Sequence, residues 1–292
     1  MKNRRDIKIG FWALIIFFAF ILLSFIMIIS SNVKGVHVSE KTVGIVEITG
    51  PIMSSKSAVD KLEKYIKNNK IPAVVIRLNT PGGAVAPTQE IYETVIKAKK
   101  AGKKVIASMG TAAASGGYYI AAACDSIVAA PATITGSIGV IATFADFSEL
   151  YRKIGIDFNV RKSGKFKDIG STSRKMTDEE KAVTDSLIMD IYDQFVTAVA
   201  EGRKLKYDFV KSIATGQVYT GRQAKKLGLV DRLGTYQDAV DLAGILSGIG
   251  KNPPVTNENK GFLWDLMDEG TEGMILKNLN FKMPDFLYML SY

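Results

Sequence analysis

One long uncharged segment near the start constrains the chain more than any other feature. The residues from Ile9 to Val33 carry no charge and are mostly large and apolar. A helix needs roughly 20 apolar residues to cross a bilayer, so the run predicts one transmembrane helix. A cleaved signal peptide would have a shorter apolar region, of about 7–15 residues, and a small-residue cleavage site. We therefore expect an uncleaved anchor.

The charges around this segment predict its orientation. Four basic residues lie within the first eight positions, and basic flanks stay in the cytoplasm. The bulk of the chain would then lie outside the cytoplasm. The predicted layout is a cytoplasmic N-terminus at 1–8, a transmembrane signal anchor at 9–33, an extracytoplasmic domain at 34–250, and a linker with a C-terminal tail at 251–292.

The remaining charge and the single cysteine exclude several classes of protein. The formal net charge is +9, but the basic residues are scattered among acids, without the aromatic-interleaved patch of a nucleic-acid binder. We expect no nucleic-acid partner. Cys124 is the only cysteine, so an intramolecular disulfide is impossible. It follows three alanines, which predicts a small buried residue.

From about residue 42 to residue 243, short apolar runs alternate with stretches of helical periodicity. This alternation predicts an α/β layered fold, with a sheet covered by helices on both faces. Capping boxes at Thr177 and Thr220 predict the starts of two helices. The expected strands are 43–48, 73–78, 105–109, 127–129, 133–141 and 229–230. The expected helices include one near 59–66, one starting near Pro87, one after Ser115, a long one with an apolar face of Val183, Leu187, Ile191 and Phe195, a short one ending at Gly228, and 236–246.

The scarcity of histidine and cysteine argues against two common kinds of catalytic site. The only histidine, His37, precedes the folded domain, which argues against a Ser–His–Asp triad. One histidine and one cysteine also make a zinc site a poor hypothesis. We expect neither a metal nor a cofactor.

A serine in a run of small residues remains. Residues 109–119 read MGTAAASGGYY, and Ser115 falls where a strand is expected to give way to a helix. The Gly82-Gly83 turn follows another predicted strand in the same way. Two such turns at one edge of a sheet could supply two backbone N–H donors to an oxyanion. The pattern favours acyl transfer with Ser115 as the nucleophile.

Without a nearby histidine, the serine needs another base. A lysine has a reference pKa of about 10.4 and acts as a base only where burial keeps it neutral. The segment 162–171 reads KSGKFKDIGS and holds Lys162, Lys165 and Lys167. The residues alone leave all three as candidates.

At these segments the sequence resembles the SppA/protease IV family of signal peptide peptidases, in its short single-domain form. The likeness covers about 43–242, including LNTPGG (78–83), TGSIGV (135–140), SGKFKDIGS (163–171) and GQVYTGRQAKKLGLVD (216–231). It implies Ser115 as nucleophile, Lys167 as general base and Ser137 as the holder of the lysine amine. The implied oxyanion donors are the amide of Gly82 or Gly83 and that of Gly116. Lys165 is a local rival, because alternation along a strand would send it to the same face as Lys167.

The resemblance also implies a setting. It implies a crotonase/Clp-protease-like fold and a ring-shaped homo-oligomer, in which serine and lysine can come from adjacent protomers. The implied substrates are peptides, namely apolar signal-peptide remnants at a bacterial cell membrane, and no cofactor is required. Two alternatives are a crotonase-like acyl-CoA enzyme and a non-catalytic membrane scaffold. A further hypothesis is that the apolar C-terminus, FLYMLSY, occupies a neighbour's peptide groove and is trimmed there.

Overall fold

The structure, a computed structural model, describes residues 17–18, 21–22, 41–257 and 287–289. The chain divides into two compact units, 1–40 and 41–292. No helix in this described part has both the length and the apolarity to cross a bilayer. The predicted anchor lies outside the described residues, apart from the helical Phe17, Phe18, Ile21 and Leu22, and so does His37. The anchor and the predicted domain limits stay predictions.

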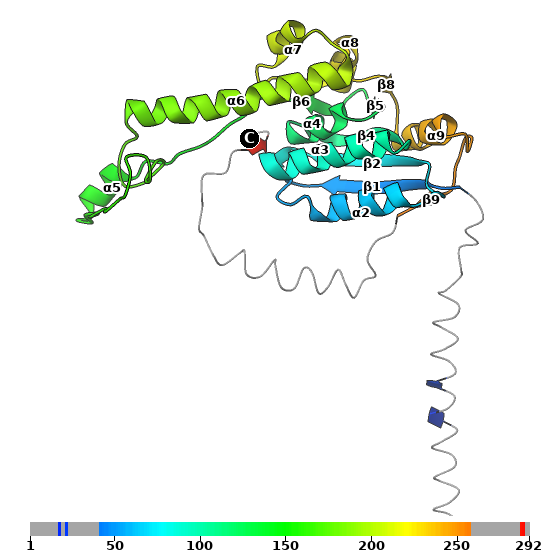
Figure 1. The fold of residues 1–292 in the computed structure, drawn as a ribbon, viewed down its shortest axis with the longest axis horizontal. Coiled ribbons are helices and arrows are strands. Elements are labelled where there is room, and N and C mark those ends of the chain that lie inside the picture. The colour runs from blue at the N-terminus through cyan, green and yellow to red at the C-terminus, as the bar shows by residue number, and fades with distance from the viewer. Residues whose placement is uncertain (1–16, 19–20, 23–40, 258–286, 290–292) are drawn as a thin grey trace, which may run out of the picture. The chain divides into compact units, whose positions relative to one another are not determined.

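The second unit alternates strands and helices, as predicted (Figure 1). Its strands are β1 (Val43–Thr49), β2 (Ala73–Thr80), β3 (Gly82–Ala84), β4 (Lys104–Ala114), β5 (Ser126–Ala129), β6 (Ile134–Gly136), β7 (Val218–Thr220), β8 (Arg232–Leu233), β9 (Val255–Thr256) and β10 (Leu287–Met289). Its helices are α2 (Lys56–Lys67), α3 (Val85–Lys100), α4 (Gly116–Ala122), α5 (Ser148–Lys153), α6 (Asp178–Arg203), α7 (Tyr207–Ile213), α8 (Gly221–Lys226) and α9 (Tyr236–Leu246).

The main sheet of the described residues has eight strands, and its central strands are parallel. The order is β7-β6-β4-β2-β1-β9, with β5 pairing β4 and β8 pairing β5. Only β7 runs antiparallel to its neighbour, β6, in this sheet. A mostly parallel sheet must be covered on both faces, because its strands are apolar on both sides.

Strand β2 illustrates how the two faces are covered. Val74, Ile76 and Leu78 join a core under α2, α3, α4 and the C-terminal half of α6. Ala73 and Val75 point to the opposite face and join the side chains of α9. Side chains alternate along a strand, so one apolar run serves both cores. The predicted α/β fold with a doubly covered sheet is confirmed.

Strand β4 is longer than predicted and changes its partner halfway. On one edge, Ile106–Met109 pair with β5, whereas Ala112–Ala114 pair with β6. On its other edge β4 follows β2, with a register shift between Leu78 and Thr80. The change of partner carries the end of β4 beyond β5 and towards β6.

Two predicted strands differ from the structure. Residues 133–141 contribute only the three residues of β6. Leu229 and Val230 are buried but do not form a strand, because the Leu229 N–H donates to the carbonyl of Ala224 and closes the end of α8. The strand begins three residues later, as β8. The apolar pair indicated burial correctly and strand pairing wrongly.

Helix α6 begins at the predicted capping box, in which Thr177 Oγ1 accepts from the Glu180 N–H and the Glu180 carboxylate accepts from the Thr177 N–H. Its predicted apolar face is buried only in part. Phe195 is fully buried, but Val183 and Leu187 are exposed. The N-terminal half of α6 extends away from the sheet together with the segment 141–177, which contains α5 and is called the arm here (Figure 1).

Candidate active site

Ser115 lies at the predicted junction, between the last residue of β4 and the first residue of α4. The residue is 1% exposed, with φ of 54° and ψ of −118°. This conformation is unfavourable for a residue with a Cβ, and such strain concentrates at functional sites. A serine on a sharp strand-to-helix turn is also the arrangement of the nucleophile in α/β-hydrolases. The geometry therefore suits a reactive hydroxyl.

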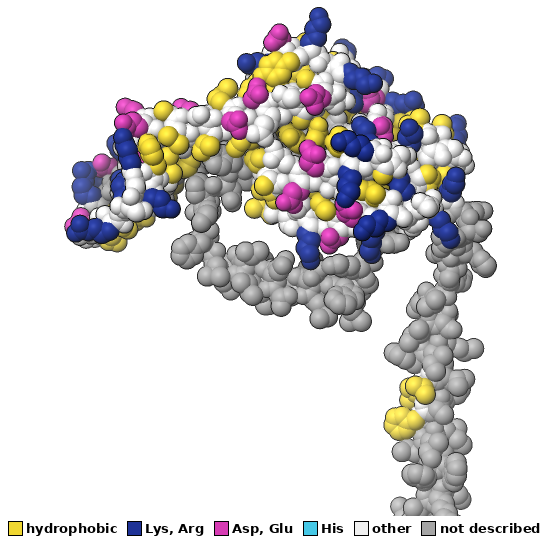
Figure 2. Space-filling model, viewed as in Figure 1, with side chains coloured by type: hydrophobic (Ala, Val, Ile, Leu, Met, Phe, Trp, Pro, Cys, Tyr) yellow, Lys and Arg dark blue, Asp and Glu magenta, His cyan; other side chains and the backbone are white. Residues whose placement is uncertain are grey.

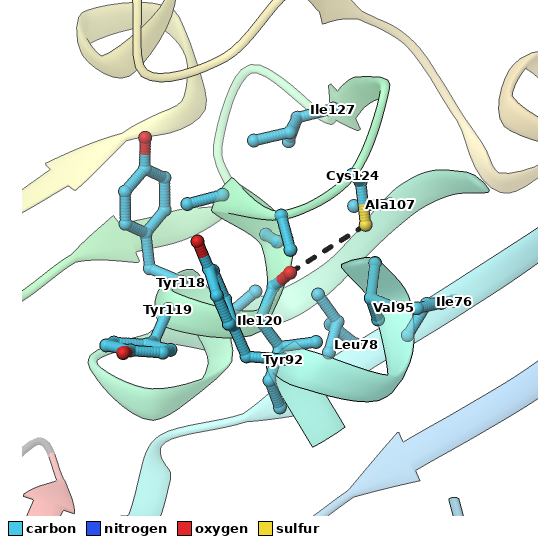
Figure 3. Close-up of a cluster of buried hydrophobic side chains, with 14 of the residues drawn as sticks. Ile76, Leu78, Tyr92, Val95, Ala107, Tyr118, Tyr119, Ile120, Cys124 and Ile127 are labelled. Carbon is cyan, nitrogen blue, oxygen red and sulfur yellow. Dashed lines mark hydrogen bonds between the residues drawn. The ribbon is translucent and has the colours of Figure 1, made fainter. Parts of the chain in front are cut away.

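The surroundings of α4 hold this turn in place. The Ser115 N–H donates to the Gly136 carbonyl at 2.8 Å, and the Tyr118 hydroxyl donates to the Leu229 carbonyl at 2.9 Å. The Tyr119 ring packs against Tyr92 at 4.8 Å between ring centroids (Figure 3). It also packs against Phe195, at 5.0 Å. These contacts fix α4 and hence the direction of Ser115.

Gly117 permits the close approach of α4 to the end of β2. A Cβ at this position would lie 2.7 Å from Thr80 Cγ2, which is closer than side chains tolerate. Small residues are therefore required around the predicted nucleophile for packing as well as for chemistry.

Ser137 lies beside Ser115 because their strands pair in register. Ala114 is opposite Gly136, and both serines follow directly. Neighbouring strands are about 4.8 Å apart, which brings the two residues side by side. Ser137 is 7% exposed and, like Ser115, has a positive φ, of 50°. Two of the four described non-glycine residues with positive φ are thus the serines named from the sequence.

The Gly82-Gly83 turn lies at the same edge of the sheet. Thr80 pairs with Ala113, two residues before Ser115, so the two predicted turns are neighbours. The Gly82 N–H donates to Thr80 Oγ1 at 3.1 Å and is therefore engaged inside the turn. Gly83 lies so close to Ile52 that a Cβ there would meet the Ile52 carbonyl oxygen at 2.2 Å, but Ile52 forms its backbone hydrogen bonds with Gly82 and Ala84, not with the Gly83 amide. Of the two glycines, Gly83 is the better placed to offer its amide to another chain.

The strand facing Gly83 is β10, from the far end of the sequence. It pairs antiparallel with β3, with Leu287 opposite Ala84, Tyr288 opposite Gly83 and Met289 opposite Gly82. It also lies against α3 and α4, the helix that starts after Ser115. An extended peptide segment thus occupies the edge beside the candidate nucleophile.

The three lysines that are candidates for the general base lie in the arm and not beside Ser115. Turns rather than a strand form residues 165–170, so the expected alternation of Lys165 and Lys167 does not apply. Lys165 forms an ion pair with Glu179, and Lys162 pairs with Asp168 at 2.6 Å. The Lys167 amine has no hydrogen bond or ion pair with any described residue.

Within one chain, Lys167 and Ser115 are not brought together. The lysine segment is held to the N-terminus of α6 through Lys165 and Glu179. Ser115 precedes α4, and Tyr119 of α4 packs on Phe195 in the C-terminal half of α6. The 15 residues from Glu180 to Phe195 span roughly 22 Å at about 1.5 Å per residue. This separation exceeds the reach of a lysine side chain.

The described residues contain no group of three or more His, Cys, Asp or Glu side chains arranged to hold a metal ion. Cys124 is buried, as predicted, and its Sγ lies 3.8 Å from the Ile120 carbonyl oxygen (Figure 3). Burial raises the pKa of the Cys124 thiol to about 12, so it is a packing residue and not a nucleophile.

A buried, strained serine beside a second serine and a glycine turn is an arrangement typical of serine-dependent acyl-transfer enzymes. The model of peptidase family S49 matches residues 97–249, and the chain belongs to this family of serine peptidases.

Relatives support this assignment. A Synechocystis sp. relative is 46% identical over 212 residues, which cover 72% of this chain and 76% of the relative. Protease 4 of Salmonella typhi is 38% identical over 178 residues, covering 61% of this chain but 29% of that protein. The chloroplastic serine protease SPPA of Arabidopsis thaliana is 33% identical over 219 residues, which cover 73% of this chain and 32% of that protein. The chain thus spans about a third of the length of the last two.

A comparison with solved structures gives a likeness to a point mutant of ClpP1 from Listeria monocytogenes. The TM-score is 0.47 and the identity 16%, over 67% of this chain and 94% of that one.

The strain at Ser115 leads to a prediction about stability. Ser115→Gly and Ser115→Ala both remove the hydroxyl, but only glycine adopts a φ of 54° without a steric penalty. We expect the glycine variant to be the more stable of the two, by about 1 kcal/mol. Denaturant unfolding of both variants measures the difference. Equal stability, or a more stable alanine variant, would contradict strain at this position.

Proposed function

We propose that the protein is a membrane-anchored endopeptidase in which Ser115 is the nucleophile and Lys167 of a neighbouring copy is the general base. Its proposed substrates are apolar peptides, specifically signal-peptide remnants left after release from preproteins. The observation that carries the proposal is the strained, buried Ser115 beside Ser137 and the Gly82-Gly83 turn. Membership of peptidase family S49 supports the reaction class.

The pairing of the lysines favours Lys167 as the base. A carboxylate partner stabilises the protonated amine, and Lys162 and Lys165 each have one. Lys167 is the member of the three whose amine is free among the described residues. In the proposed assembly, Ser137 of the neighbouring copy would accept or donate a hydrogen bond to this amine.

The arm supports a homo-oligomer, which we propose to be ring-shaped. Eight of its large apolar side chains are exposed, and so are Val183 and Leu187 on the adjoining half of α6. Figure 2 shows apolar side chains on the surface of this part of the molecule. Exposed apolar surface of this extent marks interaction sites. A second copy is the fitting partner, because the dyad is incomplete in one chain. The eight residues are Ile141, Phe147, Leu150, Ile154, Ile156, Phe158, Val160 and Phe166.

The proposed reaction is an acyl transfer in two steps. The neutral Lys167 amine takes the proton from Ser115 Oγ, which attacks the peptide carbonyl carbon. The amides of Gly83 and Gly116 hold the oxyanion, and the lysine ammonium protonates the leaving amine as the C–N bond breaks. A water that gives its proton to the same amine then hydrolyses the ester, and Ser115 regains its proton.

Two features support an apolar, extended peptide as substrate. Strand β10 pairs with β3, so this edge accepts a peptide strand in the antiparallel direction. A pocket of about 700 Å³ adjoins Ser137 and is lined mainly by apolar residues. Its principal apolar walls are Val140, Ile141, Ile188, Met189 and Tyr192.

The setting of the enzyme is part of the proposal. We infer a crotonase/Clp-protease-like fold for residues 34–250, a signal anchor at 9–33 and a bacterial extracytoplasmic location. An anchor would hold the site where signal-peptide remnants arise. The acyl-CoA alternative would need a cytoplasmic substrate, and measurable CoA binding would favour it. A chain that assembles but hydrolyses no peptide would favour the scaffold alternative.

The dyad predicts the outcome of three substitutions in the full-length protein in detergent. Ser115→Ala and Lys167→Ala should each lower kcat/KM for apolar fluorogenic peptides by about 1,000-fold or more. Lys165→Ala, the matched control, should change it little. Wild-type activity should rise towards alkaline pH, since only a neutral lysine accepts the proton.

The same experiment can reject the mechanism. Undiminished activity of Ser115→Ala would exclude it, and loss with Lys165→Ala alone would move the base by two residues. A rate that is flat from acid to alkaline pH would argue against a titrating lysine.

Sharing of the site between copies predicts complementation. Ser115→Ala and Lys167→Ala are each expected to be inactive alone. In mixed assemblies, a copy with intact Ser115 can meet a neighbour with intact Lys167, at about a quarter of the sites if mixing is random. We therefore expect activity to reappear on co-expression of the two variants. Failure to recover activity in proven mixed assemblies would place both residues in one chain.

The pairing of β10 with β3 predicts that the tail competes with substrate. A chain ending at Pro284 lacks β10 and should show a KM lower by roughly two- to tenfold, since a tethered segment competes at high effective concentration. Tyr288→Pro keeps the length but removes the N–H opposite Gly83, and should act in the same direction. An unchanged KM in both variants would mean that substrate does not use this edge.

A further inference from the structure

An ion-pair cluster lies directly beside the proposed base, in the arm. The Arg174 guanidinium donates from Nε to Asp168 Oδ2 at 2.9 Å and from Nη2 to the Asp168 backbone carbonyl at 3.3 Å. It also donates from Nη1 to Glu180 Oε2 at 2.8 Å. Arg174 thus joins the residue after Lys167 to the first turn of α6.

The far side of the cluster is firmly anchored. The Glu180 side chain is almost fully buried, and its carboxylate also accepts from the Thr177 N–H at 2.8 Å. Arg174 and this N–H lower the pKa of the Glu180 carboxyl to about 2, so it stays ionised. The capping box of α6 is therefore the fixed point from which Arg174 holds the lysine turn.

The cluster also compensates the charge of Asp168, the residue that follows Lys167 in the chain. Asp168 is the adjacent carboxylate, and an unpaired carboxylate there would favour the protonated lysine and oppose a general base. Both of its oxygens are engaged, by Arg174 and by Lys162 at 2.6 Å. The Arg174 guanidinium and then Lys162 hold the pKa of Asp168 well below its usual range. The other charged residues in the adjoining chain are Lys165, which pairs with Glu179, Lys175, and Asp178, which pairs with Lys181.

We propose that Arg174 is a positioning residue for Lys167, which ties the lysine turn to α6 and compensates the Asp168 carboxylate. The inference rests on the proposed function, in which Lys167 is the base. Arginine suits this role because its planar fork binds two carboxylates in a fixed geometry, which a lysine cannot reproduce. Arg174 acts through Lys167 and does not itself touch the reacting atoms.

Arg174→Gln in the full-length protein tests the proposal. We expect kcat to fall about 10- to 100-fold with little change in KM, as for a small displacement of a catalytic group. The rise of activity with pH should also move to higher pH, because the Asp168 charge is then compensated by Lys162 alone. The matched control is Arg152→Gln, which removes an exposed arginine paired with Glu149 in α5 of the same arm.

Two further variants separate the roles of charge and geometry. Arg174→Lys keeps the positive charge but lacks the planar guanidinium. The pH profile should therefore match that of the wild type, while kcat recovers only in part. Asp168→Asn combined with Arg174→Gln removes both charges. The pH profile should again match that of the wild type, while kcat stays low. Thermal unfolding and the size of the assembly are measured for every variant.

The outcomes are distinguishable. Arg174→Gln with the kcat and pH profile of Arg152→Gln would overturn the inference. So would a loss of activity that follows a loss of assembly and is not relieved by Arg174→Lys, since Arg174 would then be purely structural. Lys167→Ala, assayed in parallel, separates the two hypotheses, because an active Lys167→Ala would reject the dyad itself.

Discussion

The change of partner along β4 is the constraint on which the candidate site depends. After Met109 the strand leaves β5, and from Ala112 it pairs with β6. The bend between them would leave backbone N–H groups without ladder partners, and buried N–H groups need partners. The Asn79 side-chain oxygen accepts from the N–H groups of Thr111 and Ala112, at 3.1 and 3.4 Å. With the bend satisfied, the ends of β4 and β6 run side by side, and each leads into a serine.

Strain at these two serines is maintained by packing. A positive φ at a non-glycine residue persists only where the surrounding structure determines it. Ser115 is held by α4, whose residues are all buried. The Tyr118 hydroxyl of this helix donates a hydrogen bond to the Leu229 carbonyl. Ser137 is held by the hydrogen bond that its N–H donates to the Gln217 carbonyl at 2.8 Å. The stability of the layered core thus supports a conformation that the turn would not adopt alone.

Much of this arrangement could be predicted from local signals, and the remainder depends on contacts between distant residues. The apolar runs predicted the central strands, and the capping box at Thr177 predicted the start of α6. The small residues around Ser115 predicted that this serine joins a strand to a helix. The strand at 229–230 was wrong because burial and strand pairing leave the same apolar signal. No local sequence pattern predicts that Leu287–Met289 pair with Gly82–Ala84, or that Arg174 forms ion pairs with both Asp168 and Glu180. The role of each site residue stays a prediction.

Helix α6 links the two halves of the proposed dyad. Its C-terminal half packs on α4, where Gly202 lies so close to the Ala122 carbonyl that a Cβ would meet it at 2.1 Å. Its N-terminal turn holds the lysine segment through Glu180, and the whole helix spans roughly 39 Å at about 1.5 Å per residue. A lysine amine exposed to water is protonated at neutral pH and is no base. In the proposed assembly, the neighbouring copy therefore supplies the burial that makes the amine neutral as well as the serine that it activates. Assembly would then be a condition of catalysis, because an isolated chain holds a strained serine and a solvated lysine too far apart to react.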